Sequence, residues 1–124
     1  MKIKNIKITI KDRKQVLDEF AKTWHLMKEG KAQYGHDEIS FQNINAFRNA
    51  FTEKRMEVLH TIKEENPRSI YDLAKKLRRD FKNVSCDVHF LQALGLISLE
   101  KQHDARNRVK PMIDFEMLRL DIKI

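Results

Sequence analysis

The sequence is poor in the residues from which several kinds of site are built. Its 124 residues include one cysteine, three glycines, two prolines and one tryptophan. A single cysteine excludes a disulfide framework within the chain and fits a reducing compartment. With so few glycines the chain has no P-loop, no GxGxxG and no GxSxG pattern, so glycine-rich phosphate loops and the nucleophile turn of hydrolases are excluded.

Long apolar runs and metal-ligand spacings are missing as well. No stretch approaches the roughly 18 to 20 apolar residues that span a bilayer, and residues 1–10 lack the apolar block of a signal peptide. We expect a cytoplasmic protein with no membrane contact. The five histidines, at positions 25, 36, 60, 89 and 103, show neither HExxH nor a Cys/His zinc spacing, so no metal is expected.

Two arrangements come nearest to a reactive site. Cys86 and His89 lie three residues apart, and a cationic histidine could lower the pKa of a thiol. We favour the alternative that Cys86 is a small neutral residue on an exposed helix face. The carboxylates are scattered among lysines and form no acid/base pair, so we expect no catalytic residue, no cofactor and no enzyme.

The charge of the chain leans strongly to one sign. Lys and Arg number 25 against 18 Asp and Glu, which gives a net charge of +7 and a sequence pI near 9.6. A mixed surface could lean basic without any function, but the distribution favours an anionic partner. Residues 75–82 hold a single acid, Asp80, and five cations: Lys75, Lys76, Arg78, Arg79 and Lys82.

Residues 69–99 have the pattern of two short helices joined by a tight basic turn. Ser69 can cap the first helix and Asp72 can reach back to its start. Asp80 can cap the second helix, and Gly95 followed by Leu96 is typical of a Schellman-type end. The apolar positions predict one buried face on each helix: Ile70, Leu73, Ala74 and Leu77 on the first, and Phe81, Val84, Val88 and Leu91 on the second.

The opposite face of the second helix carries the side chains that nucleic acids bind. Lys and Arg pair with phosphate or guanine, and Asn can bond adenine through two atoms. Lys82, Asn83, Cys86 and His89 lie on this face, with Ser85 at its flank. Arg78 and Arg79 occupy the turn before it. The pattern predicts a recognition helix.

A hairpin with a charged tip is expected next. Ile97 and Leu99 alternate with polar residues, residues 101–108 are polar, and a second extended run covers 109–114. A hairpin directly after a recognition helix is a wing. Its cations could reach the flanking DNA backbone: Lys101, Arg106, Arg108 and Lys110.

The runs SIYDLAKKL and RRDFKNVSCDVHFLQALGLISLE, followed by the basic hairpin with Pro111, resemble the MarR-like winged helix-turn-helix regulators, more narrowly a group of small prokaryotic transcriptional regulators. The resemblance covers residues 51–124. It implies a regulator that binds double-stranded DNA, and because some relatives are antitoxins encoded beside a toxin, it implies an antitoxin and autorepressor as the setting. Two positions depart from the family pattern: Arg78 replaces a common glycine, and Cys86 replaces a common basic residue.

The remaining segments predict short strands and helices around this core. Strands are expected at residues 2–10, around Ile39 and Phe41, and near Leu118 to Ile124. Because short terminal strands are unstable alone, we expect them to pair with each other, with the wing or with a second chain. A helix capped by Thr52 should cover residues 52–65, with Met56, Leu59 and Ile62 inward, after a short helix marked by Ile44, Phe47 and Phe51.

An amphipathic helix is expected from Asp12, with an apolar stripe that would form a dimer interface rather than a ligand pocket: Val16, Leu17, Phe20, Trp24 and Met27. The predicted fold is therefore α+β and mainly helical, a winged helix-turn-helix over 51–124 with an N-terminal strand-helix extension over 1–50 that dimerises.

The function predicted from these features is sequence-specific binding of double-stranded DNA by a homodimer, with a toxin protein as a further partner. The predicted DNA-binding residues are Ser69, Arg78, Arg79, Lys82, Asn83, Ser85, Cys86, His89, Arg106, Arg108 and Lys110. The alternative is a winged-helix module that binds protein rather than DNA, through Phe90 and Ala93 and through the helix that carries Trp24.

Overall fold

The computed structural model describes residues 5–10, 38–103 and 108–122, together with positions 14, 17, 18 and 21. The chain divides into two compact units. The first contains Met1–Asn49 and Phe115–Ile124, and the second contains Ala50–Asp114. The second unit is thus an insertion between the two parts of the first.

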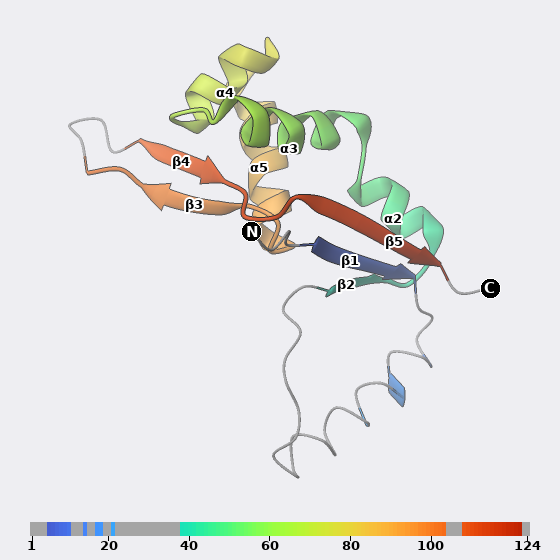
Figure 1. Cartoon of the computed structure of the whole chain (residues 1–124). Coiled ribbons are helices and arrows are strands. Elements are labelled where there is room, and N and C mark those ends of the chain that lie inside the picture. Colours follow the sequence, from blue (N-terminus) through green and yellow to red (C-terminus); the bar gives the residue numbers. More distant parts are fainter. Residues whose placement is uncertain are drawn as a thin grey trace. The chain divides into compact units, whose positions relative to one another are not determined.

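Over the described residue ranges, the first unit is built on a three-stranded parallel sheet (Figure 1). Its strands are β1 (Asn5–Ile10), β2 (Glu38–Phe41) and β5 (Met117–Ile122), in the order β2-β1-β5. Ile8 lies opposite both Ile39 and Leu120. Because side chains alternate along a strand, this register places every apolar side chain of one face together: Ile6, Ile8, Ile10, Ile39, Phe41, Leu118, Leu120 and Ile122.

The other face of the sheet is polar and carries hydrogen bonds. The hydroxyl of Thr9 donates to Oε1 of Glu38 over 3.1 Å and lies 3.0 Å from the hydroxyl of Ser40. Lys7 pairs with Asp121 over 3.6 Å. The short helix α2 (Ile44–Ala50) follows β2, and Phe47 packs edge-on against Phe41 with ring centroids 5.8 Å apart. Phe47 of α2 therefore covers part of the apolar face beside β2.

Pairing of the two terminal strands with each other is confirmed, since β1 pairs with β5 along six residues. This pairing also moves a predicted boundary: residues 115–124 belong to the first unit and not to the helical one. Of the helix expected from Asp12, positions 14, 17, 18 and 21 are helical. The rest of it, including Phe20, Trp24 and Met27, lies outside the described residues.

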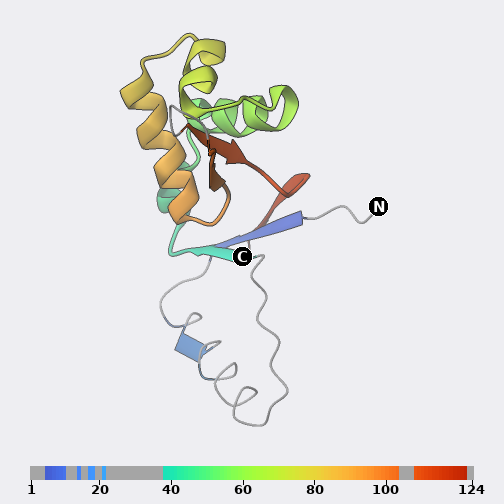
Figure 2. The ribbon, with the colours of Figure 1, turned by 90° about the vertical axis from the view of Figure 1, so that its left-hand side faces the viewer.

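In the part of the second unit that the structure describes, three helices are followed by a two-stranded hairpin (Figure 2). These are α3 (Glu53–Glu65), α4 (Ile70–Leu77), α5 (Phe81–Ala93), β3 (Ser98–Lys101) and β4 (Val109–Met112). The strands are antiparallel, with Glu100 opposite Lys110. This order of elements is that of a winged helix and agrees with the predicted segments. In the described parts of the chain, no helix has the length and apolar character needed to cross a bilayer.

The helix caps follow the sequence closely. Ser69 accepts a hydrogen bond from the backbone N–H of Asp72 over 3.0 Å, and the Asp72 carboxylate accepts one from the N–H of Arg68 over 3.0 Å, one residue before the expected position. Thr52 and Asp80 cap α3 and α5. Each cap satisfies an amide at a helix start that would otherwise lack a partner.

The core of the second unit holds the apolar faces of its three helices. Its buried members on the helices are Val58, Leu59, Ile62, Ile70, Leu73, Ala74, Val84, Val88 and Leu91. Two residues expected inward, Met56 and Phe81, are exposed. Helical spacing shows which arc of a helix surface is apolar, but it does not show how much of that arc the neighbouring helices cover. On α3, Val58 occupies the inward position in place of Met56.

Candidate nucleic-acid interface

The turn between α4 and α5 is closed by a Schellman motif in which an arginine takes the place of glycine. Arg78 adopts the left-handed conformation, with φ of 54°. Its N–H donates to the carbonyl of Lys75, and the N–H of Arg79 donates to that of Ala74, both over 3.1 Å. A left-handed residue with a Cβ costs about 1 to 2 kcal/mol. The folded state includes this strain, and in it the motif holds an exposed arginine shortly before α5.

Beside that turn lies an ionic cluster that joins three elements. Asp87 of α5 accepts from Nη2 of Arg79 in the turn over 2.8 Å and from Nε of Arg55 in α3 over 3.3 Å. Arg55 also donates to the carbonyl of Ala50 over 3.0 Å and lies 3.8 Å above the ring centroid of Phe90. We call Arg55, Arg79 and Asp87 the Asp87 cluster.

The Asp87 cluster is shielded from water, since the side chains of Asp87 and Arg79 are only 15% and 17% exposed. Charges in such a position are held in fixed geometry, because losing one partner would leave the other buried and unpaired. Arg79 was predicted to contact DNA. Its guanidinium bonds to Asp87, and this geometry favours a positioning role that sets α5 against α3 and the turn.

The outward face of α5 carries the predicted side chains. Lys82, Asn83, Cys86 and His89 are exposed, on the side opposite the buried Val84, Val88 and Leu91. Nδ1 of His89 lies 2.7 Å from the carbonyl oxygen of Ser85. Because a carbonyl oxygen only accepts, Nδ1 is the donor of this hydrogen bond. Ser85 itself is half-buried and lies against His89, at the edge of this face.

An exposed aromatic pair lies where the first turns of α4 and α5 meet. The rings of Tyr71 and Phe81 have centroids 4.8 Å apart and planes inclined by 30°. Both side chains are exposed, although isolated large aromatic groups usually avoid water. Phe81 thus extends the outward face of α5 towards α4 instead of filling the core.

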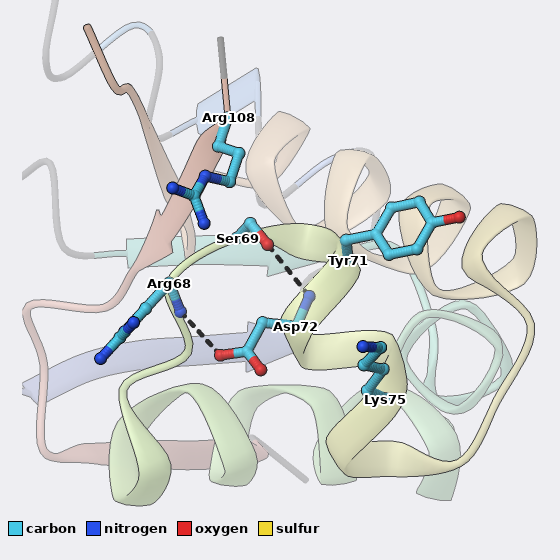
Figure 3. A pocket seen from close by; sticks show the side chains of 6 residues that line it. All are labelled: Arg68, Ser69, Tyr71, Asp72, Lys75 and Arg108. Atoms are coloured by element: carbon cyan, nitrogen blue, oxygen red, sulfur yellow. Dashed lines mark hydrogen bonds between the residues drawn. The ribbon is translucent and has the colours of Figure 1, made fainter. Parts of the chain in front are cut away.

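A basic pocket opens at the first turn of α4 (Figure 3). Its volume is about 490 Å³, and its lining residues are Arg68, Ser69, Tyr71, Asp72, Lys75 and Arg108. A smaller adjoining hollow of about 170 Å³ shares Arg68 and Arg108 and adds Gln102 and Lys110. We call these two together the basic pocket. Four cations and the amide end of a helix make it a favourable place for an anion.

The basic pocket brings together predicted residues of the helix start and of the hairpin, and it adds two cations that the sequence analysis does not include among the DNA-binding residues. Ser69 comes from the helix start, and Arg108 and Lys110 come from the hairpin. Arg68 and Lys75 were not among the predicted site residues. A useful signal for Arg68 was its position directly before the helix cap, where a side chain borders the free amides. The predicted wing residue Arg106 lies outside the described residues.

No curated protein matches the sequence, whereas a family model and a solved structure do. The structure described as "Structure of Disulfide formed AbfR" is similar with a TM-score of 0.49 at 15% sequence identity, over 82% of this chain and 70% of that chain. The family model described as HVO_A0114 matches residues 50–120, which include the whole of α3, α4, α5 and the hairpin. The chain belongs to the HVO_A0114 family.

Proposed function

We propose that this protein is a transcriptional regulator that binds double-stranded DNA with α5 in the major groove. The observation that carries the proposal is the outward face of α5. It presents Lys82, Asn83 and His89 to solvent on a helix whose opposite face is fully buried. Such a helix can enter a groove without exposing its core, and the side chains at its start are those that reach base edges in helix-turn-helix proteins.

The basic pocket supports a second set of contacts, to the phosphate backbone. Lys75 borders it from α4, Arg68 borders it from the position before the helix cap, and Arg108 borders it from the hairpin. Backbone contacts fix the position of a protein on a duplex but carry no sequence information. We therefore assign base reading to Asn83 and Lys82, and positioning to the basic pocket and Arg78.

The binding is stoichiometric, without a cofactor or a reaction. The resemblance to MarR-like regulators supports a sequence-specific repressor. An antitoxin that represses its own gene and binds a toxin is the narrower prediction, and it depends on that resemblance alone. The rival module that docks protein through Phe90 is less well supported, because the guanidinium of Arg55 already covers that ring.

The test is titration of the protein against a selected duplex and a scrambled duplex, at several salt concentrations. The affinity for both duplexes should fall steeply as salt rises. Replacing Asn83 by Ala should cost about 1 to 3 kcal/mol on the selected site and little on the scrambled one. Replacing Arg108 by Ala should weaken both equally and reduce the salt slope by about one unit.

A matched control is Lys54→Ala on α3, an exposed lysine outside the two proposed contact sets. It removes the same charge as a contact lysine would, and we expect its affinity and salt slope to stay close to those of the parent. Equal losses for Asn83→Ala on both duplexes, or no salt dependence in the parent, would overturn the proposal.

A further inference from the structure

The sheet of the first unit has one edge that differs from ordinary sheet edges. In the described residues, β5 has β1 on one side and no strand on the other. A strand of six residues presents a full row of backbone donors and acceptors there. Natural sheets blunt such edges with proline, a bulge, a short strand or inward charges. The opposite edge strand β2 is short, with four residues, whereas β5 contains no proline and keeps regular pairing with β1 throughout.

The apolar face of the sheet is covered unequally. At the β2 side, Phe47 of α2 packs on Phe41. At the β5 side, Leu120 and Ile122 are 41% and 50% exposed. Exposed leucine and isoleucine on a regular edge strand mark a surface that associates with another surface.

The charges of β5 are arranged so that the strand is complementary to itself. Consider two copies of β5 paired antiparallel about a two-fold axis through Leu120. Arg119 of each copy then lies opposite Asp121 of the other, and Leu118 lies opposite Ile122. Arg119 and Asp121 lie on the polar face of the sheet, while the leucines and Ile122 lie on the apolar face. Directly opposite residues on one face are the interacting pairs of an antiparallel ladder.

We propose that β5 is a homodimer interface, in which two copies of this chain pair antiparallel about Leu120 and join their sheets into one of six strands. This register forms two equivalent Arg119–Asp121 ion pairs and covers Leu120 with its own copy. Symmetric pairs of this kind are the rule at two-fold interfaces. The resulting sheet has an ordinary number of strands for a folded protein. The proposal concerns the first unit only and does not depend on DNA binding.

The first test uses the full chain with Cys86→Ser, so that no native thiol interferes. Leu120→Cys should form a covalent dimer under mild oxidation, because the two thiols would lie on directly opposite residues, within the reach of a disulfide. Ile122→Cys is the matched control. In the proposed register it lies opposite Leu118 and far from its own copy, so it should form far less covalent dimer.

The second test is sedimentation of the full chain at several concentrations. Arg119→Asp places like charges opposite each other at two equivalent positions, and we expect the dimer dissociation constant to rise on the order of tenfold. A charge-exchanged variant should restore the dimer. It combines Arg119→Asp and Asp121→Arg with Lys7→Glu, and the third change keeps the ion pair between positions 7 and 121 within each chain. Lys54→Asp, the same charge change on α3, should leave the constant unchanged.

Circular dichroism of each variant separates a lost interface from a lost fold. A parent that sediments as a monomer at tens of micromolar would overturn the proposal. So would a dimer that Arg119→Asp leaves intact, or equal crosslinking of the two cysteine variants, since each excludes the β5 register. A failure to bind DNA would bear only on the proposed function.

Discussion

Two helix ends in the second unit have the same backbone geometry but different residues at the critical position. α5 ends in a Schellman motif with Gly95 at φ of 83°, where the N–H of Leu96 donates to the carbonyl of Leu91 over 3.0 Å. α4 ends in the same motif with Arg78 at φ of 54°. Glycine adopts this conformation without strain, and arginine does not.

The difference follows from what each turn does. The turn after α5 leads to the hairpin through buried Leu96 and Ile97, so an apolar contact fixes it. The turn after α4 leads to the outward face of α5 and is fixed by the Asp87 cluster. In the proposed complex, the arginine turn places a cation beside the DNA, whereas the glycine turn supplies only the bend.

The largest effect should come from breaking the cluster that supports the arginine turn. Asp87→Ala leaves two arginines without their acid, one of them with its Nη1 already buried and unbonded among the described residues. We expect a loss of about 2 to 4 kcal/mol in the free energy of unfolding. Chemical denaturation measures it. Asp80→Ala, which removes an exposed acid of the same size and a single cap bond, should cost about 1 kcal/mol, and equal losses would contradict the central role of Asp87.

The glycine turn should be sensitive to conformation alone. A Cβ added at Gly95 would meet no atom within 4 Å, so Gly95→Ala tests the positive φ without a clash. We expect it to lower the free energy of unfolding by about 1 kcal/mol. Thermal or urea unfolding would show this, and an unchanged midpoint would mean that the turn relaxes to another conformation.

The reverse substitution should stabilise the other turn. Arg78→Gly relieves the strain and should raise the free energy of unfolding by about 0.5 to 1 kcal/mol, while it weakens binding to DNA of any sequence. Asn66→Gly is the matched control, because Asn66 also has a positive φ, of 47°, but ends α3. Since asparagine tolerates this conformation, its gain should be smaller and its DNA affinity unchanged.

The smallest effect is expected at Cys86, on the face that follows the arginine turn. Cys86→Ser keeps a small neutral side chain at an exposed position, so stability should change by less than about 0.5 kcal/mol and DNA affinity hardly at all. Moderate peroxide should also have little effect. Release of DNA by peroxide in the parent but not in the serine variant would show that Cys86 is a redox sensor.

The sequence predicted the local features well because each depends on residues close together in the chain. The caps at Ser69 and Asp80, and the end at Gly95, are set by side chains within one helical turn of the bonds they make. The buried stripes of α4 and α5 follow from helical periodicity in the same way.

The features that were missed depend on distant partners. Arg55 and Asp87 are remote in the sequence and meet only once α3 packs on α5. A signal was present, because Asp87 is the only acid on α5 and lies next to buried Val88, where a carboxylate needs a cation. The position of Phe81 likewise depends on a distant residue, because its ring lies against Tyr71 of α4, and the periodicity of α5 contains no information about that contact.

The pairing of β1 with β5 has a consequence for the order in which the chain can fold. β1 cannot pair with β5 until Leu120, the neighbour of Ile8 in the sheet, has been synthesised. The ribosome makes the entire helical unit between these two strands. The helices have mostly local contacts, which form quickly, whereas pairing strands from opposite ends of a long segment is slow. During synthesis the helical unit can therefore fold while β1 is still unpaired on its β5 side. The sheet closes last, which makes its apolar face the surface most exposed to chaperones and to aggregation in the nascent protein.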